Sequence, residues 1–192
     1  MMPRPARVTK STELKTMEHS NLAKPLPDII APGLLILFIG YNPGLRSAEL
    51  GHHYAGKSNR FWEILFRSGL TAEKLSYTRD RELLAHGFGS TNIVDRPSKG
   101  ADELTREEYL MGRGQLLAQL AEYKPAIACY VGGGVYKAFT GIAKTDWGLQ
   151  PERTLAGTTD YVAPSTSGLN RMLMAEQVRI YRGLKELLDL IE

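Results

Sequence analysis

Four short apolar runs, each followed by a loop of turn-forming residues, constrain the fold of this chain more than any other feature. Helical patterns separate the runs, and alternating strands and helices are typical of an α/β fold. We therefore expect a mainly parallel central sheet covered by helices on both faces. The runs are LLILFI (34–39), TNIV (91–94), AIACYV (126–131) and TDYVA (159–163).

End signals place three helices. In SNRFWEILFRSG, Ser58 is the expected N-cap and Gly69 the stop. A second helix begins at Thr105, which forms a capping box with Glu108, and runs to about Glu122. The last helix carries an apolar stripe at three- and four-residue intervals, which predicts packing on the sheet. The stripe is Met174, Val178, Tyr181, Leu184, Leu188 and Ile191.

Size and charge favour a single folded unit. A chain of 192 residues with 43% hydrophobic content buries one sizeable core. Residues 1–24 carry five basic and two acidic residues, which accounts for the net charge of +3. We expect a flexible basic leader over residues 1–28 and one domain over residues 29–192, with the leader at most an auxiliary electrostatic handle.

The single cysteine, Cys129, excludes a disulfide framework and a cysteine-based zinc site, as in reducing compartments. No apolar run approaches the roughly 18 residues of a membrane span, and the first residues lack the apolar block of a signal peptide. We expect a soluble cytoplasmic protein, associated with the nucleoid if the source is bacterial.

The loops that follow the four apolar runs are expected to form the active edge, because ligands of open parallel sheets bind beyond the carboxyl ends of the strands. In GYNPG, Gly40 and Gly44 allow backbone to approach a ligand closely, while Pro43 stiffens the turn. Asn42 offers one acceptor and two donors. Its amide could hold a water or read a planar amide edge, or it could cap its own turn.

Other motifs exclude common kinds of site. VGGGVYK fits neither the dinucleotide nor the Walker fingerprint, and a close strand-to-helix turn whose N–H groups could face an anion explains it. No HxH or HxxxH spacing occurs, so no metal site is expected. His52 and His53 instead suit donation toward phosphates. No GxSxG elbow supports a hydrolase triad. The basic residues near the histidines are Arg46, Lys57 and Arg60.

Several segments resemble, in the same order, the mismatch-specific uracil-DNA and thymine-DNA glycosylases of the uracil-DNA glycosylase superfamily. GYNPGLRSAELGHHYAGKSNRFWEILFRSGL is similar to their first motif region, where GINPG precedes an aromatic loop and NRFW or NHFW. GFGSTNIVDRPS resembles their middle segment, WGLQP recurs in it, and VAPSTSGLNR is similar to their second motif. The similarity runs from about Gly33 to Ile191.

This resemblance implies a three-layer α/β/α sandwich and a monofunctional DNA glycosylase of base-excision repair. Such an enzyme flips a mismatched or damaged pyrimidine out of duplex DNA and hydrolyses its N-glycosidic bond, leaving an abasic site. The implied base is uracil opposite guanine, with thymine or modified cytosine as further candidates. Neither a metal nor a cofactor is implied. The expected partner is double-stranded DNA containing G:U or related lesions, bound by a monomer.

Residue by residue, the resemblance assigns the chemistry to the first motif region. Asn42 matches the asparagine that holds the attacking water against C1′ of the deoxyribose. Tyr54 matches the aromatic residue that stacks on the flipped base, and backbone around Tyr41 and Tyr54 would read the polar edge of that base. The implied base-binding residues are Gly40, Tyr41, Ser47 and Tyr54.

The second motif implies the residues that meet DNA. Arg171 would lie near the phosphates or the widowed base, and Lys57 matches a phosphate contact. Two departures bear on substrate range. Position 41 is Tyr where the family usually has Ile, and PSTSGLNR is intermediate between the bacterial NPSGL and the thymine-glycosylase PSSSA forms. The implied wedge, which enters the duplex where the base has left, is Gly168, Leu169, Asn170 and Arg171.

A second catalytic candidate follows from residue chemistry. Asn42 can orient water but is a weak base, which predicts a slow enzyme unless a carboxylate helps. Asp95 follows TNIV on the same rim, where it could activate water or stabilise a cationic sugar. Its alternatives are an ion pair with Arg96 or a cap. The alternative function is a catalytically weak module that binds damaged or mismatched DNA.

Overall fold

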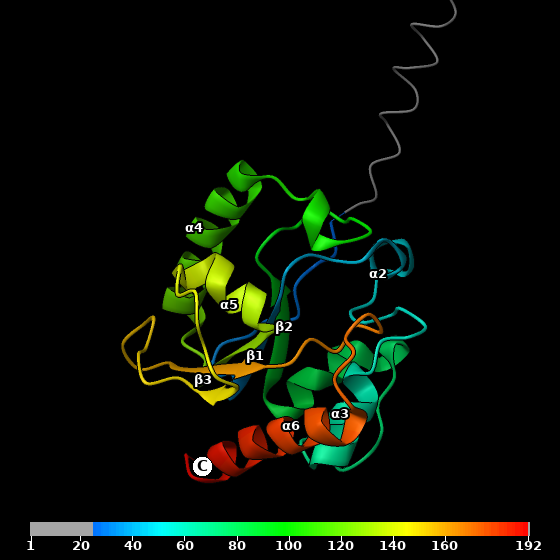
Figure 1. Cartoon of the computed structure of the whole chain (residues 1–192). Helices are drawn as coiled ribbons and strands as arrows, with labels where there is room; N and C mark the ends of the chain where they lie inside the picture. Colours follow the sequence, from blue (N-terminus) through cyan, green and yellow to red (C-terminus); the bar gives the residue numbers. More distant parts are fainter. Residues whose placement is uncertain (1–24, 192) are drawn as a thin grey trace, which may run out of the picture.

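The computed structural model describes residues 25–191, which form a five-stranded sheet with helices on both faces (Figure 1). The strand order is β2-β1-β3-β5-β4. Only β4, at one edge, is antiparallel to its neighbour, so the expected mainly parallel sheet is confirmed. The strands are β1 (Ile36–Gly40), β2 (Phe88–Asn92), β3 (Ile127–Val131), β4 (Gly148–Leu149) and β5 (Thr159–Ala163).

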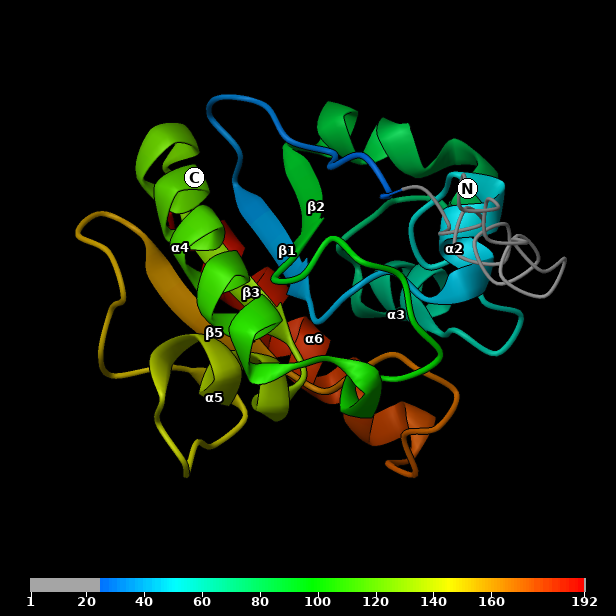
Figure 2. The same ribbon diagram turned by 90° about the horizontal axis from the view of Figure 1, so that it is seen from above.

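The α-helices form the two outer layers, with α4 and α5 on one face of the sheet and α3 and α6 on the other (Figures 1 and 2). Alternation along β1 explains the arrangement: Ile36 and Phe38 face α3 and α6, whereas Leu37 and Ile39 face α4 and α5. The expected three-layer sandwich is confirmed. The helices are α2 (Leu45–Leu50), α3 (Phe61–Ser68), α4 (Arg106–Tyr123), α5 (Gly133–Thr140) and α6 (Met174–Asp189), with 3₁₀ turns η1 (Tyr77–His86) and η2 (Ala101–Glu103).

Helix-end signals mostly hold. Gly69 ends α3 with a left-handed φ of 82°, and Thr105 and Glu108 form the predicted capping box of α4. Ser58, however, is not the N-cap of α3, which begins at Phe61. The reason is that Asn59 closes a turn onto Gly56, and its side-chain Oδ1 accepts the Phe61 N–H at 3.0 Å.

Two other boundaries differ from expectation. β2 starts at Phe88 rather than at residue 91. Its first residues are buried, but Gly89 and Ser90 are not strongly apolar, so the apolar run in the sequence did not include them. In α6, the middle of the predicted stripe is buried, but Ile191 lies past the end of the helix and is 46% exposed.

The predicted leader lies outside the described residues as far as residue 24. Its last four residues are described and pack against the domain. Leu26 is buried, the Pro27 carbonyl lies 3.0 Å from His53 Nε2, and Asp28 Oδ2 accepts from Gln119 Nε2 at 2.7 Å. No helix within residues 25–191 is long and apolar enough to cross a membrane.

Candidate active site

Hydrogen bonds between loops join the carboxyl ends of the parallel strands into one rim. The loop after β1 is tied to the loop after β2, since the Val94 N–H donates to the Tyr41 carbonyl at 2.8 Å and the Ser98 N–H donates to the Pro43 carbonyl at 3.2 Å. The segment before α3 is tied to the loop after β5, because the Arg60 N–H donates to the Thr166 carbonyl at 2.9 Å. The loops of three strands thus share one edge.

Asn42 is held by its amide nitrogen. Nδ2 donates to the Arg96 carbonyl at 2.9 Å and to Ser98 Oγ at 2.8 Å, with the Pro43 carbonyl further away at 3.3 Å. Because carbonyl oxygens cannot donate, these contacts fix which end of the amide is nitrogen. No donor within residues 25–191 reaches Oδ1. The arrangement therefore leaves Asn42 with an oriented acceptor, and it is not a simple turn cap.

The loop that orients Asn42 is braced by α4. The Ser98 hydroxyl donates to the Gly100 carbonyl at 2.6 Å, which turns its lone pairs toward Asn42. Arg96 forms a two-point ion pair with Glu108, with Nη2 3.0 Å from Oε2. The Arg96 guanidinium and the Thr105 backbone lower the pKa of Glu108 to about 2. Arg96 is therefore engaged by α4 and does not pair with Asp95.

Asp95 points to a different part of the rim. It is exposed and lines a hollow of about 320 Å³ on the α4 side of β2. Partial burial, and then the charge of Asp28, raise the pKa of Asp95 above its usual range. Asn42, in contrast, touches Arg96 and Ser98 further along the same loop. The other residues around the hollow are Asp28, Asn92, Gln115, Leu116, Ala118 and Gln119.

Tyr54 forms an aromatic platform beside this loop system. Its ring is stacked on Phe61, with centroids 3.6 Å apart and planes 13° apart, and it meets Trp62 edge-on at 6.2 Å. Its hydroxyl lies 3.3 Å from Ser90 Oγ. Tyr54 also has a left-handed φ of 53°, which a non-glycine residue rarely adopts. Backbone and ring are thus both fixed by surrounding contacts.

His53 is part of the scaffold, which corrects the expectation that both histidines donate toward phosphates, whereas His52 stays partly exposed. His53 is 3% exposed, with Nδ1 2.9 Å from Ser90 Oγ and its backbone N–H donating to Asp80 Oδ2 at 2.8 Å. Burial lowers the pKa of His53. His52 Nδ1 lies 3.1 Å from Asp80 Oδ1. The buried carboxylate of Asp80 therefore contacts both histidines and fixes the loop that carries them.

Three other predicted base-binding residues contribute mainly through backbone or packing. A Cβ on Gly40 would lie 2.6 Å from Asn92 Oδ1, so any other residue there would displace the Asn92 side chain. The Tyr41 ring packs edge-on against Tyr109, and its hydroxyl abuts Gly134, where an added Cβ would meet it at 1.9 Å. Its backbone, not its ring, therefore lies at the rim.

Ser47 is buried, and its hydroxyl accepts the Ala55 N–H at 3.1 Å. This contact spans the loop between α2 and Tyr54. The structure thus gives Ser47 a role in closing that loop, while the neighbouring Lys57 is exposed. Only Lys57 of these two predicted contacts presents its side chain to solvent.

The loop after β5 presents the apolar side chains of Leu169 and Leu173 to solvent. Leu169 is 87% exposed, and Arg171 beside it is also exposed. Asn170 faces inward instead: Nδ2 donates to the Ser165 carbonyl at 2.7 Å and Oδ1 accepts the Met172 N–H at 3.0 Å. In Figure 1 this orange segment lies beside the cyan loop that precedes α3. Of the predicted wedge, Leu169 and Arg171 project and Asn170 shapes the turn.

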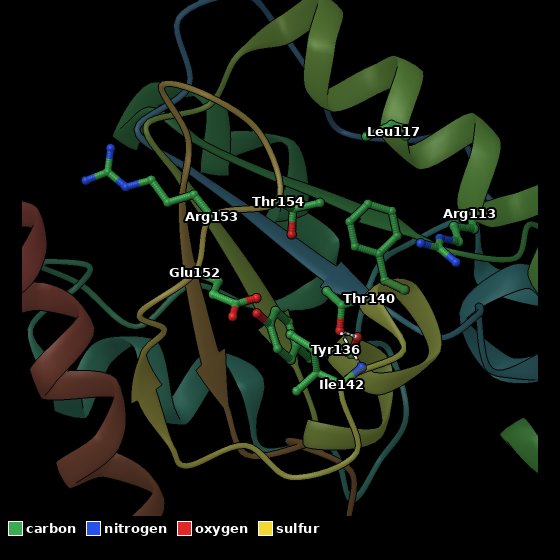
Figure 3. A pocket seen from close by; sticks show the side chains of 9 residues that line it. Arg113, Leu117, Tyr136, Thr140, Ile142, Glu152, Arg153 and Thr154 are labelled. Carbon is green, nitrogen blue, oxygen red and sulfur yellow. Dashed lines mark hydrogen bonds between the residues drawn. The ribbon is translucent and has the colours of Figure 1, made fainter.

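A second hollow of about 320 Å³ lies between α4, α5 and the loop before β5 (Figure 3). None of the predicted site residues lines it. The hollow is lined by Arg113, Leu117, Tyr136, Phe139, Thr140, Ile142, Glu152, Arg153 and Thr154.

The described residues offer no cluster of metal ligands. Among residues 25–191 no group of three His, Cys, Asp or Glu side chains could hold a metal.

Two residues of this site were not predicted from sequence. Ser98 orients Asn42, and its only sequence signal was its place after a strand in DRPSKG. Arg60 donates from its side chain to the carbonyls of Asn170 and Met172 in the loop after β5, although it reads in sequence as a surface cation. The role of Ser98 and the role of Arg60 each depend on a partner more than 50 positions away in the sequence.

Comparisons with known proteins agree with this fold. The family model described as uracil DNA glycosylase superfamily matches residues 27–185. The solution NMR structure of a provisionally assigned uracil DNA glycosylase from Methanosarcina acetivorans superposes with a TM-score of 0.56 at 20% identity, covering 85% of this chain and 98% of that chain. That likeness concerns the fold. The family match covers most of the sequence, and the chain belongs to the uracil DNA glycosylase superfamily.

Proposed function

We propose that this protein is a monofunctional DNA glycosylase that excises uracil from G:U pairs in duplex DNA and leaves an abasic site. Thymine and modified cytosine opposite guanine are further candidate bases. The observation that carries the proposal is the fixed amide of Asn42, whose nitrogen is held by Arg96 and Ser98 while Oδ1 accepts from no other residue of the described chain. Such an acceptor can hold a water by one of its protons.

The platform and the exposed leucine support extrusion of a base. A pyrimidine inside the duplex cannot be reached, and flipping it costs a few kcal/mol, least for a mispaired base. Stacking on Tyr54, together with insertion of Leu169 into the vacated space, would offset this cost. Arg171 and Lys57 would meet the phosphates. The protein is proposed to act on duplex DNA as a monomer.

The bond-breaking step follows from these contacts. The electron pair of the C1′–N bond leaves with the pyrimidine as an anion, and the sugar becomes oxocarbenium-like. Water held by Asn42 adds through its oxygen to C1′ and loses a proton. We assign that proton to Asp95, which lines a neighbouring hollow of the same rim and would receive it through intervening water, not by direct contact with the water that Asn42 holds. Backbone groups around Tyr41 and Tyr54 would stabilise the base anion.

Single-turnover release of uracil from a duplex with one G:U pair tests this assignment. Asn42→Ala is expected to slow release about 100- to 1000-fold, as for loss of one fixed polar group in a site. Asp95→Ala is expected to slow it about 100-fold, as for loss of a general base. Glu122→Ala, which removes an exposed carboxylate near the C-terminal end of α4, at the edge of the sheet opposite the rim, is the matched control.

DNA binding by each variant is measured alongside. Binding that persists while release is lost supports chemical roles for Asn42 and Asp95. If the wild-type protein binds the G:U duplex but releases no base, the glycosylase proposal fails, and a module that binds mismatched DNA takes its place. If Asp95→Ala retains full activity while Asn42→Ala loses it, Asn42 positions the water without help from the Asp95 carboxylate.

A further inference from the structure

Arg60 forms several hydrogen bonds to the loop that carries Leu169. We call residues 165–172 the wedge loop. The Arg60 backbone N–H donates to the Thr166 carbonyl at 2.9 Å, and Nη1 donates to the Met172 carbonyl at 3.2 Å. Nη2 donates to the Asn170 carbonyl. These bonds lie on both sides of Leu169, so one residue fixes the loop before and after its exposed apolar side chain.

The same chain segment builds the base platform. Phe61, directly after Arg60, is the residue on which the Tyr54 ring is stacked, and Trp62 meets that ring edge-on. Asn59, directly before Arg60, caps the Phe61 N–H. Four consecutive residues therefore connect the platform to the wedge loop, with Arg60 as their link to the loop.

The wedge loop also rests directly on the turn before Arg60. A Cβ on Gly168 would lie 2.3 Å from Ser58 Oγ, so a side chain at that position would push the loop away. The Arg60 guanidinium is partly buried, and its described partners are carbonyls; no carboxylate within residues 25–191 pairs with it. Hydrogen bonds from a charged donor are stronger than neutral ones, which favours a fixed loop.

We propose that Arg60 is a positioning residue that couples the wedge loop to the Tyr54 platform, so that insertion of Leu169 and seating of the flipped base occur in one fixed geometry. The proposal rests on the proposed glycosylase function and adds a residue through which that function depends on duplex DNA. It predicts that loss of Arg60 harms excision from a duplex, where a base must be displaced, more than from a single strand.

The test compares uracil release from a G:U duplex and from the same strand alone, using Arg60→Met, Arg60→Lys and Leu169→Ala. Arg60→Met is expected to lose about 100-fold on the duplex, since misplacing a group by about 1 Å has such an effect. On the single strand it is expected to lose about threefold or less. Leu169→Ala should share this pattern, and Arg60→Lys should recover part of the duplex rate. Arg67→Met, at an exposed arginine of α3, is the matched control.

A second readout does not need turnover. A 2-aminopurine beside the uracil becomes brighter when the stack opens, so the wild-type protein should raise its fluorescence on binding and Arg60→Met should not. Equal losses on duplex and single strand, or an unchanged fluorescence rise in Arg60→Met, would overturn the coupling. If the wild-type protein raises the fluorescence but releases no uracil, the glycosylase function fails while the fluorescence comparison still decides the role of Arg60.

Discussion

The two halves of the candidate site are held from opposite faces of the sheet. Asn42 is oriented by Arg96 and Ser98, and Arg96 is braced by Glu108 of α4. Tyr54 and the wedge loop are held by Phe61 and Arg60 at the start of α3. The group assigned to water activation and the groups assigned to base extrusion therefore have separate supports. Damage to one support should leave the other working.

The largest effect is expected when both halves are broken together. Asn42→Ala and Leu169→Ala act through separate supports, so their losses in single-turnover uracil release should multiply, and the double variant should retain about the product of the two residual rates. Measuring all four proteins on one G:U duplex checks this. A double variant that is no slower than Asn42→Ala alone would mean that the halves are not independent.

An intermediate effect is expected at Ser98. Ser98→Ala removes one of the two close acceptors of Asn42 Nδ2 and leaves the Arg96 carbonyl. Loss of one hydrogen bond is worth about 1 kcal/mol, which slows the chemical step about fivefold. The fluorescence rise of 2-aminopurine should remain, because the wedge is held from α3. Ser76→Ala, an exposed serine between α3 and η1, serves as the control.

The smallest effect is expected from Glu108. Its pKa of about 2 lies below its ordinary 4.5, so its contribution to stability is present above about pH 4.5 and is lost as the pH falls toward 2. Glu108→Gln removes this titration. Urea unfolding at pH 5 and pH 3 should show a smaller acid loss of the unfolding free energy for Glu108→Gln than for the wild-type protein. Equal acid losses would show that Glu108 does not brace the loop.

Much of the fold could be predicted because its signals are local. Apolar runs marked the parallel strands, and Thr105 with Glu108 marked the start of α4 within four residues. β2 was misplaced because Gly89 and Ser90 are buried by the sheet without being apolar themselves. The short antiparallel β4 also left no apolar run.

The site was predictable only in part. Asn42, Tyr54 and Leu169 are assigned to the site from motifs that resemble a family, and their roles remain predictions. The roles of His53 and Arg60 were missed because each depends on a partner distant in sequence: Pro27 is 26 positions from His53, and Met172 is 112 positions from Arg60. The chemistry of a polar side chain shows what it can bind, but tertiary structure decides what lies beside it.

The left-handed backbone at Tyr54 has a consequence for engineering. A non-glycine residue at such a φ costs about 1 kcal/mol or more, so glycine or asparagine there would relieve strain. Either replacement would also remove the ring that lies on Phe61. Truncating a packed aromatic side chain costs about 3–5 kcal/mol, which exceeds that strain, so screens that select for heat resistance alone should keep tyrosine at position 54. At this residue, thermal stability and base stacking therefore require the same side chain.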